Sequence, residues 1–511
     1  MYRIFGPPGT GKTTTLLNKV DDALRSGVQP TKIAFLAFTR KAAEEARERA
    51  ASRFNLDPKK DLYFFRTLHS LALNLSDISP AQVMQHSHYE EISNAAGIRL
   101  TATSKVSFDE DLPDVIKASN PILGLISLAR LRKVPLRQQY NQSEMETPWH
   151  TVAHVNNCLS TYKSERKMYD FTDMLEIFAT EGINFCPHFD LCFVDEAQDL
   201  SPMQWDIAHL LDERSKRMYV AGDDDQAIYR WAGADVDAFI NLDGGSDTLS
   251  QSYRIPYTVH KVAERIVKRI QRRVVKNYEP RHTMGDTNYY RSFSDVDFSE
   301  GSWLVLAQAG YMLKDVAETL KSSGFLFEYR GSRSISAKIS DAVNGWEQLR
   351  KGKAVSGLTA RNIYEYMSAK DSINSCKRIQ RGFKKLAGVE DDEFFTLKDL
   401  QDKHGLLATD EMIWSLAMDR LPEKERAYIT ALLRRGEKFN GAPRIIISTI
   451  HGSKGGEADN VVVFSDISAA AERDMRVKPD DMHRVFYVAV TRTREKLFII
   501  EAENLTRSYD I

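Results

Sequence analysis

The sequence predicts an α/β protein with two parallel-sheet cores, and three observations support this fold class. Eight short apolar runs, rich in β-branched and aromatic residues, each end in a polar or glycine-rich turn. Helix-like patterns follow them, and this alternation indicates parallel strands covered by helices on both faces. The runs also form two groups, 2–5, 32–38, 191–194 and 218–222 in the first half and 303–307, 444–449, 461–464 and 496–500 in the second.

Two stretches interrupt this alternation. Residues 70–165 and 333–440 lack such runs and have helix-like patterns, for example "DEMIWSLAMDRL" in the second stretch. Each stretch is therefore interpreted as a mostly helical insertion into a sheet domain. The predicted domains are a first sheet domain (1–68 and 166–247), its insertion (69–165), a second sheet domain (248–332 and 441–511) and its insertion (333–440).

Composition narrows the class of protein. The 511 residues suffice for several domains, and 42% hydrophobic with 28% charged residues is typical of a globular protein. The net charge of −1 gives no overall attraction to nucleic acid, although a local basic groove is compatible with it. The four cysteines form no CxxC pair, which argues against zinc or iron–sulfur sites. With no targeting signal and no apolar run near ~20 residues, we expect no membrane association and a cytoplasmic location, bacterial or in the host of a virus.

The first motif follows the first apolar run. "GPPGTGKT" matches the phosphate-binding pattern GxxxxGK[ST] between a strand and a helix. Glycines allow backbone N–H groups to surround phosphate oxygens, Lys12 can reach the terminal phosphates, and the Thr13 hydroxyl can bind Mg²⁺. The alternative, an accidental glycine–proline turn, does not explain the flanking strand and helix. The predicted nucleotide-binding loop is Gly6, Pro7, Pro8, Gly9, Thr10, Gly11, Lys12, Thr13 and Thr14.

A pair of acids follows the third apolar run. In "LCFVDEAQD", Asp195 would hold Mg²⁺ through water, and Glu196 would orient or deprotonate the attacking water. Such a pair alone is often only a solvated turn, but with the phosphate loop it indicates nucleoside triphosphate hydrolysis. The implied cofactors are ATP and Mg²⁺.

Further motifs specify the kind of hydrolase. "FLAFTRKAAEEARERA", "FRTLHSLA", "VDEAQDL", "AGDDDQAIYRWAGA", "QSYRIP", "IHGSKGGE" and "YVAVTRTREKLFI" occur in this order. Together they resemble the superfamily 1A DNA helicases of the UvrD/Rep type, over nearly the whole chain. The resemblance implies two RecA-like domains, with ATP in the cleft between them and single-stranded DNA across both.

The resemblance also assigns nucleotide contacts outside the loop. Gln226 matches a glutamine that senses the γ-phosphate, and Arg254 and Arg492 match arginines that reach it. Tyr253 matches an aromatic side chain that stacks on adenine, and Glu457 an acid that contacts the ribose.

The positions that touch single-stranded DNA in the family are also present. Aromatic rings suit this role because every base has a π-face, and core packing is the alternative for Phe38 and Trp231 in particular. The run "HKVAERIVKRIQRRVVK" (260–276) is either a solvated helix face or a surface that follows phosphates. The positions matched by resemblance are Phe38, Thr39, Thr67, His69, Tyr229, Trp231 and His451.

The sequence departs from the family pattern at several positions. Thr14 replaces an arginine that stacks on adenine, Ser252 replaces an asparagine, and Ala232 replaces an arginine after Trp231. We also expect no leader with an adenine-reading glutamine, a short second insertion and no C-terminal extension or nuclease domain. Use of nucleotides other than ATP is therefore compatible with the sequence.

The resemblance implies an ATP-driven translocase on single-stranded DNA and a 3′–5′ helicase that unwinds tailed duplex DNA during repair, replication or recombination. We expect a monomer or weak dimer, and the sequence names no protein partner. One alternative is a nucleotide-gated single-strand clamp or protein-displacing remodeller with little unwinding. Another is a P-loop kinase or switch, which has no use for Gln226, the Tyr229–Trp231 pair or two further arginines.

Overall fold

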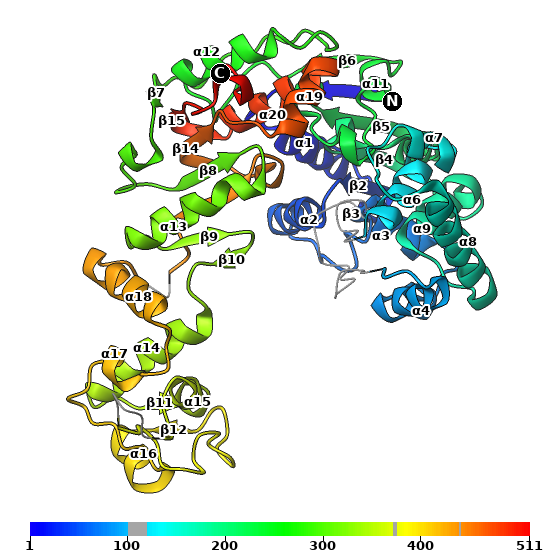
Figure 1. Ribbon diagram of the computed structural model, residues 1–511. Coiled ribbons are helices and arrows are strands. Elements are labelled where there is room, and N and C mark those ends of the chain that lie inside the picture. The colour runs from blue at the N-terminus through cyan, green and yellow to red at the C-terminus, as the bar shows by residue number, and fades with distance from the viewer. Residues whose placement is uncertain (101–119, 371–375, 439–440) are drawn as a thin grey trace. The chain divides into compact units, whose positions relative to one another are not determined.

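The computed structural model describes residues 1–100, 120–370, 376–438 and 441–511. These residues form two compact units (Figure 1). The first comprises residues 1–286, 470–494 and 511, and the second comprises residues 287–469 and 495–510. Residues 248–286 and 470–494, expected in the second sheet domain, thus group with the first unit. The predicted division into four domains stays a prediction, and parts of both predicted insertions (101–119, 371–375 and 439–440) lie outside the described residues.

The first unit contains a six-stranded sheet in the order β3-β2-β4-β5-β1-β6, and every neighbouring pair is parallel. All four apolar runs of the first half are strands of this sheet, which confirms the predicted α/β class. Two three-residue strands at the edges were not predicted. The strands are β1 (Tyr2–Phe5), β2 (Ile33–Ala37), β3 (Phe65–Thr67), β4 (Phe189–Val194), β5 (Ser215–Gly222) and β6 (Ser246–Thr248).

Helices cover both faces of this sheet. Successive side chains of a strand point to opposite faces, so Ile4 and Phe5 of β1 belong to different core clusters. The Ile4 cluster includes α1 (Lys12–Arg25) and α2 (Arg40–Phe54). The Phe5 cluster includes α3 (Leu68–Leu75), α9 (Phe171–Glu181) and α10 (Pro202–Glu213). A parallel sheet buried on both faces places its polar residues at the strand ends.

The remaining helices of the first unit fall into two groups. One has its own core around Ile126, Val152 and Val155, in the predicted first insertion. It consists of α4 (His86–Ala96), α6 (Pro121–Leu131), α7 (Leu136–Asn141) and α8 (Trp149–Arg166). The other group comprises α11 (Val236–Ile240), α12 (Tyr257–Val267), α19 (Ala469–Val477) and α20 (Pro479–Val490), of which α12 packs on α20.

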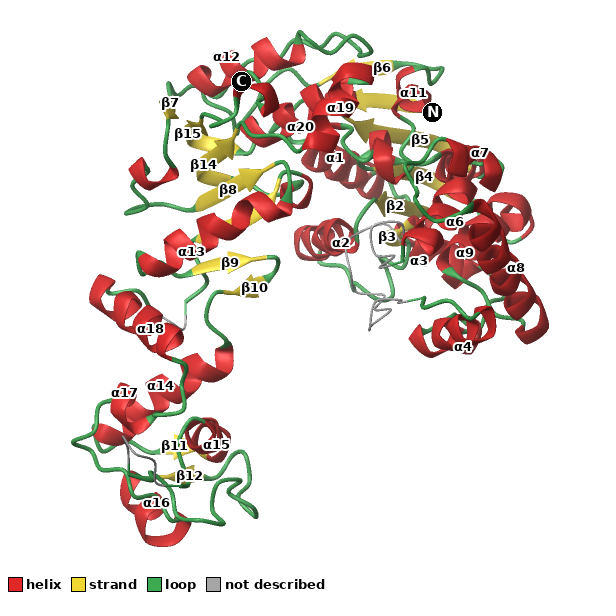
Figure 2. Ribbon diagram, viewed as in Figure 1, coloured by secondary structure: helices red, strands yellow, loops and turns green. Residues whose placement is uncertain are grey.

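The second unit contains a seven-stranded sheet in the order β10-β9-β13-β8-β14-β15-β7 (Figure 2). β9, β13, β8 and β14 pair in parallel, whereas β10 pairs with β9 in the antiparallel direction. Trp303, Val305 and Ala307 pack with Val316 and Leu320 of α13 (Lys314–Ser322). The strands are β7 (Asp286–Tyr290), β8 (Trp303–Ala307), β9 (Phe327–Tyr329), β10 (Ser332–Arg333), β13 (Ile445–Thr449), β14 (Ala458–Phe464) and β15 (Thr493–Ile500).

The helices between β10 and β13 have a separate core around the buried side chains of Trp346 and Tyr364. A short antiparallel pair, β11 (Val355–Ser356) with β12 (Phe394–Phe395), accompanies them. The helices are α14 (Ala337–Arg350), α15 (Gly357–Glu365), α16 (Leu397–His404), α17 (Trp414–Ala417) and α18 (Glu423–Arg435). In the described part of the chain, no helix is both long and apolar enough to cross a bilayer.

Candidate nucleotide-binding site

The phosphate loop connects β1 to α1. Gly9 and Gly11 have φ of +72° and +77°, in the left-handed region that favours glycine. The Lys12 ammonium donates a hydrogen bond of 2.9 Å to the carbonyl of Gly6. A Cβ on Gly6 would lie 1.9 Å from Cγ of Lys12, so only glycine allows the lysine to fold across the loop.

The two predicted metal ligands are in contact. The Thr13 hydroxyl, in the first turn of α1, donates to Oδ2 of Asp195 at 2.6 Å. Burial and the neighbouring Glu196 raise the pKa of Asp195 to about 6, against the Thr13 hydrogen bond and the Lys12 charge. A hydroxyl beside a carboxylate is a donor set that fits Mg²⁺, which prefers oxygen ligands and takes the rest from substrate phosphates and water. Within the described residues, no group of three or more His, Cys, Asp or Glu could hold a metal by itself.

Glu196 follows β4 in a strained backbone conformation. Its φ of +55° is uncommon for a residue other than glycine, and such residues cluster at functional sites. One carboxylate oxygen, Oε1, lies 3.7 Å from the ammonium of Lys12. The other, Oε2, accepts a hydrogen bond of 2.6 Å from the amide of Gln198. The carboxylate is therefore held beside the phosphate loop.

Residues 252–254 contact the outer side of the loop. The Ser252 hydroxyl, fully buried, donates to the carbonyl of Pro8 at 2.8 Å, and the Tyr253 N–H donates to the carbonyl of Gly9 at 2.8 Å. A Cβ on Gly9 would lie 2.4 Å from Cβ of Arg254. The Tyr253 side chain is 72% exposed, as a ring that stacks on a base must be accessible. Ser252, where the family has asparagine, thus contacts the loop itself.

Gln226 and Arg492 are brought together. Nη2 of Arg492 donates to Oε1 of Gln226 at 2.8 Å, and Nε2 of Gln226 donates to Oδ2 of Asp223 at 2.6 Å. Both side chains are buried. Arg254 donates to the carbonyl of Thr491 at 3.4 Å, next to Arg492. The structure therefore joins the predicted sensor glutamine to one predicted arginine directly and places the other arginine beside it.

Three consecutive acids, Asp223, Asp224 and Asp225, are buried at the end of β5 and in the 3₁₀ turn η5 (Asp224–Gln226). The Lys276 ammonium lies 3.4, 2.5 and 2.9 Å from their carboxylates, and Arg273 forms two hydrogen bonds of 2.7 Å to Asp225. Burial lowers the pKa of Lys276, but the three carboxylates outweigh burial and raise it above its usual value.

These ion pairs involve residues of the basic run 260–276. Besides Arg273 and Lys276, Arg272 also binds an acid of the same unit, Asp237, at 2.8 Å. These three basic side chains are thus bound within the fold, whereas Lys261, Arg265 and Lys268 of the same run are exposed. Whether the exposed part is a solvated helix face or a surface that follows phosphates stays a prediction.

The predicted DNA-binding residues of the first unit differ in exposure. The rings of Phe38 and Tyr229 are stacked, with centroids 5.6 Å apart, and Tyr229 is only 6% exposed. Burial raises the pKa of the Tyr229 hydroxyl. Trp231, in the 3₁₀ turn η6 (Arg230–Ala232), is 48% exposed and can contact a base.

Thr39 and Thr67 cap helices. Their hydroxyls accept hydrogen bonds of 3.2 Å from the N–H groups of Ala42 and Ser70, at the first turns of α2 and α3. His69 is half-buried in α3. A cap fixes the local chain direction, so both threonines have a structural role, and their predicted contacts with DNA stay predictions.

His451 and Glu457 belong to the second unit, in the connection between β13 and β14. His451 begins the 3₁₀ turn η9 (His451–Ser453) directly beyond β13. Their predicted contacts with DNA and ribose also stay predictions.

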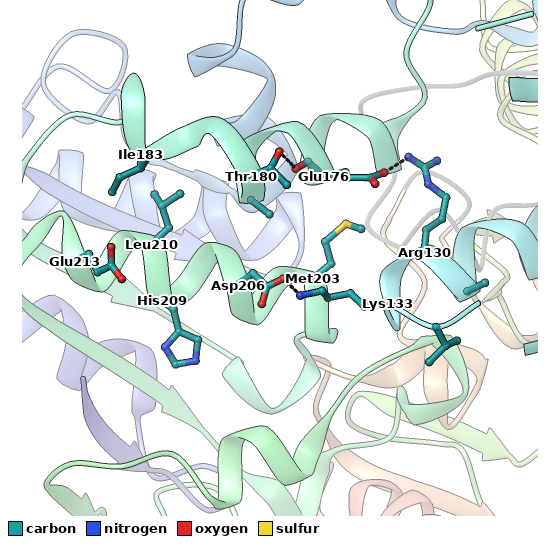
Figure 3. Close-up of a pocket in the computed structure, with 13 residues that line it drawn as sticks. Arg130, Lys133, Glu176, Thr180, Ile183, Met203, Asp206, His209, Leu210 and Glu213 are labelled. Carbon is teal, nitrogen blue, oxygen red and sulfur yellow. Dashed lines mark hydrogen bonds and ion pairs between the residues drawn. The ribbon is translucent and has the colours of Figure 1, made fainter. Parts of the chain in front are cut away.

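A groove of about 730 Å³ lies elsewhere on the first unit, between α6, α9 and α10 (Figure 3). Its lining residues do not include the phosphate loop. Charged side chains around it bind one another, with Arg130 at 2.7 Å from Glu176 and Lys133 at 2.6 Å from Asp206. The side chains of Arg130 and Lys133 are thus already bound by acids that line the same groove.

Comparison with known proteins agrees with this geometry. The UvrD/REP helicase N-terminal domain matches residues 2–245, and the UvrD-like helicase C-terminal domain matches residues 444–500. The chain belongs to the UvrD/Rep helicase family. The phosphate loop, both acids, Gln226 and Arg492 all lie in the matched ranges.

Curated relatives include proteins named ATP-dependent DNA helicase PcrA. The protein from Leuconostoc citreum is 28% identical over 387 residues, which cover 71% of this chain and 50% of the relative. The protein from Bacillus subtilis is 26% identical over 313 residues (58% and 41%), and the one from Staphylococcus aureus is 24% identical over 322 residues (58% and 42%). The chain spans about half the length of the curated relatives that it matches.

Several residues of this UvrD/Rep-type site have no role predicted from the sequence, among them Gln198, Ser252 and Lys276. Gln198 is in the quoted motif "DEAQD", two residues after Glu196, which is a signal that could have identified it. Three adjacent acids after an apolar strand require a compensating cation, but the sequence does not indicate that Lys276 supplies it.

Proposed function

We propose that the protein is an ATP-dependent translocase on single-stranded DNA and a 3′–5′ DNA helicase that unwinds tailed duplexes. One observation carries this proposal: Thr13 of the phosphate loop contacts Asp195, and Gln226 contacts Arg492. A kinase has no use for a glutamine that senses the γ-phosphate, and a nucleotide switch has no use for the Tyr229–Trp231 pair. Membership of the UvrD/Rep family and the printed names of the PcrA relatives support DNA as the substrate.

The substrate would be the Mg²⁺ complex of ATP. Thr13 and Asp195 would hold the metal ion, Lys12 would bind the terminal phosphates, and Glu196 would orient the attacking water. Negative charge on the γ-phosphoryl group would be stabilised by Arg492, whose guanidinium is bound by Gln226. Arginines in this role accelerate hydrolysis by about 10³–10⁵.

The connection after β5 would link hydrolysis to DNA binding. Gln226, at the nucleotide end, and the exposed ring of Trp231, at the DNA end, are only a few residues apart. A change in the hydrogen bond between Gln226 and Arg492 would therefore move the chain segment that carries Trp231. Stacking on a base contributes about 1–3 kcal/mol, so small movements here would change DNA affinity.

The test is unwinding of duplexes with 3′ or 5′ single-stranded tails by the wild-type protein and Glu196→Gln. We expect ATP-dependent strand separation with the 3′ tail only and none for the variant, because its amide cannot act as a base. Separation of the 5′-tailed duplex at an equal rate would refute the proposed direction. Hydrolysis that does not respond to single-stranded DNA would refute the proposed function.

A second candidate function is a nucleotide-gated clamp that displaces proteins from single-stranded DNA with little unwinding. Ala232, where relatives commonly have an arginine, is buried and offers no charge to a phosphate. This observation favours weaker binding to the DNA backbone. Strong DNA-stimulated hydrolysis with displacement of streptavidin from a biotinylated strand, but without strand separation on either tailed duplex, would favour the clamp.

A further inference from the structure

We propose that Gln198 is a positioning residue for ATP hydrolysis, whose amide joins Glu196 to the sensor segment Asp223–Gln226. The inference rests on the proposed function, because it concerns the same hydrolysis reaction. It assigns a role to a side chain that would not itself touch ATP, the metal ion or water.

The Gln198 amide is hydrogen-bonded at both of its ends. Its Nε2 donates to Oε2 of Glu196 at 2.6 Å, and also to Oδ2 of Asp199 at 3.1 Å. Its Oε1 accepts a hydrogen bond of 2.9 Å from the backbone N–H of Asp223. The side chain is fully buried in the 3₁₀ turn η4 (Ala197–Asp199), so water does not compete for these bonds. One side chain thus connects the ends of the adjacent strands β4 and β5.

The connection continues to the predicted arginine. Oδ2 of Asp223 accepts from Gln226 at 2.6 Å, and Oε1 of Gln226 accepts from Arg492 at 2.8 Å. Glu196, Gln198, Asp223, Gln226 and Arg492 therefore form an uninterrupted series of hydrogen bonds. Its members include the proposed base, the γ-phosphate sensor and the arginine that would stabilise the developing charge.

Asp223, in the middle of this series, is also held by Lys276. The Lys276 ammonium lies 3.4 Å from Oδ1 of Asp223, and the side chains of both residues are at most 1% exposed. A buried carboxylate that is held by an ion pair and a hydrogen bond keeps its position. Asp223 can therefore serve as a rigid reference point for Gln198 on one side and Gln226 on the other.

Gly222, the last residue of β5, provides independent support. A Cβ at this position would lie 2.4 Å from Oε1 of Gln198 and 2.9 Å from Cζ of Phe239. Its φ is not positive, so backbone conformation does not require glycine here. The close approach of the Gln198 amide is therefore one reason for a glycine at this strand end.

The chemistry of the amide suits this task. Only a group that donates and accepts at once can bind a carboxylate on one side and an N–H on the other. Glutamate at position 198 would keep the acceptor but place a second negative charge beside Glu196. Because Gln198 holds Oε2, it directs the other oxygen of Glu196 towards Lys12 and the phosphate loop. Misplacement of a reacting group by about 1 Å can reduce a rate by about 10².

The experiment compares Gln198→Glu and Gln198→Ala with the wild-type protein. We expect kcat for DNA-stimulated ATP hydrolysis to fall by about 10², while KM for ATP stays within about threefold, because no ATP contact is removed. Gln204→Glu is the matched control, since this buried glutamine only accepts a hydrogen bond from the Ser201 N–H and glutamate can still accept it. Its kcat should equal that of the wild type.

A double-mutant cycle separates positioning from a general structural role. Gly222→Ala should lower kcat by pushing the Gln198 amide away. If so, Gly222→Ala should lower kcat by less in the Gln198→Ala background than in the wild type, because the amide is already gone and only the close approach to Phe239 remains. Additive losses in the cycle would overturn the inference. So would a Gln198→Glu enzyme with kcat within threefold of the wild type, or an equal loss in Gln204→Glu.

Failure of this inference is distinguishable from failure of the proposed function. A wild-type protein without DNA-stimulated hydrolysis would refute the proposed function itself. Normal hydrolysis by both the wild type and the Gln198 variants would refute only the positioning role. If Gln198→Ala does not fold, the values of kcat for Gly222→Ala and Gln198→Glu would still test whether the position of the Gln198 amide matters.

Discussion

Replacement of Lys276 by methionine should destabilise the first unit strongly. Methionine has nearly the length and apolar stem of lysine but cannot compensate the three carboxylates that the ammonium now contacts. Arg273 would remain, bound to Asp225 alone among the three. Asp223 and Asp224 would then be buried without their present cation.

The magnitude follows from burial. Loss of one partner of a buried ion pair costs about 3–5 kcal/mol, because the other charge stays in a medium of low dielectric constant. For a unit of about 310 residues, the entropy of unfolding is about 0.65 kcal/mol per kelvin near its midpoint. The midpoint of thermal unfolding should therefore fall by about 5–8 °C.

Differential scanning calorimetry at pH 8 measures this change. Lys268→Met is the matched control, because this exposed lysine pairs with Glu264 at 3.3 Å across one helical turn, and such pairs contribute about 0.3–0.5 kcal/mol. In Lys276→Met, the uncompensated carboxyl groups should have pKa values above those of the unfolded chain. The folded state then binds more protons, so the deficit relative to wild type should shrink as the pH is lowered towards about 5. A decrease in the unfolding midpoint of less than about 2 °C, or a decrease equal to that of Lys268→Met, would refute this reasoning.

Three other predictions follow from single positions. Gly9→Ala should abolish nucleotide binding in a fluorescent-ATP titration, because the φ of Gly9 is +72° and a Cβ would collide with Ser252 and Arg254. Gly27→Ala is the control and should bind the nucleotide normally, because Gly27 has a φ of +92° but open space around it. Trp231→Ala should weaken single-stranded DNA binding about tenfold in fluorescence anisotropy and reduce DNA stimulation, while hydrolysis without DNA is unchanged; unaltered stimulation would contradict a stacking role. Cys376 should react with Ellman's reagent within seconds at pH 8, whereas Cys186, whose pKa burial raises to about 11, should react only on unfolding.

Much of the fold could be predicted because long apolar strands are visible in the sequence. In β4, for example, Cys192 and Val194 face one core cluster and Phe193 the other, so this part of the strand is a continuous apolar run. The strand Ser246–Thr248 gives no such signal, since its three residues are polar and exposed at the sheet edge. It exists because β1 offers hydrogen-bonding groups along its free side.

The site could be predicted where residues lie at strand ends inside a motif, as Thr13 and Asp195 do. Their contact follows because the carboxyl ends of neighbouring parallel strands meet at one sheet edge. The partners of Asp223 could not be predicted in the same way, because Gln198 precedes it by 25 positions and Lys276 follows it by about fifty. Nothing local in "QRRVVK" distinguishes a buried counter-charge from a solvated one. That difference arises only when the segment packs against η5.

Pro7 and Pro8 give the phosphate loop an entropic advantage. Proline fixes φ near −65° in the unfolded chain as well as in the folded one. Both proline carbonyls are also engaged, that of Pro7 by the Thr10 hydroxyl at 2.7 Å and that of Pro8 by Ser252. Ordering this part of the loop is thus completed during folding, and little conformational freedom is left to lose when phosphate arrives. This part of the loop should therefore add little to the entropic cost of binding the nucleotide.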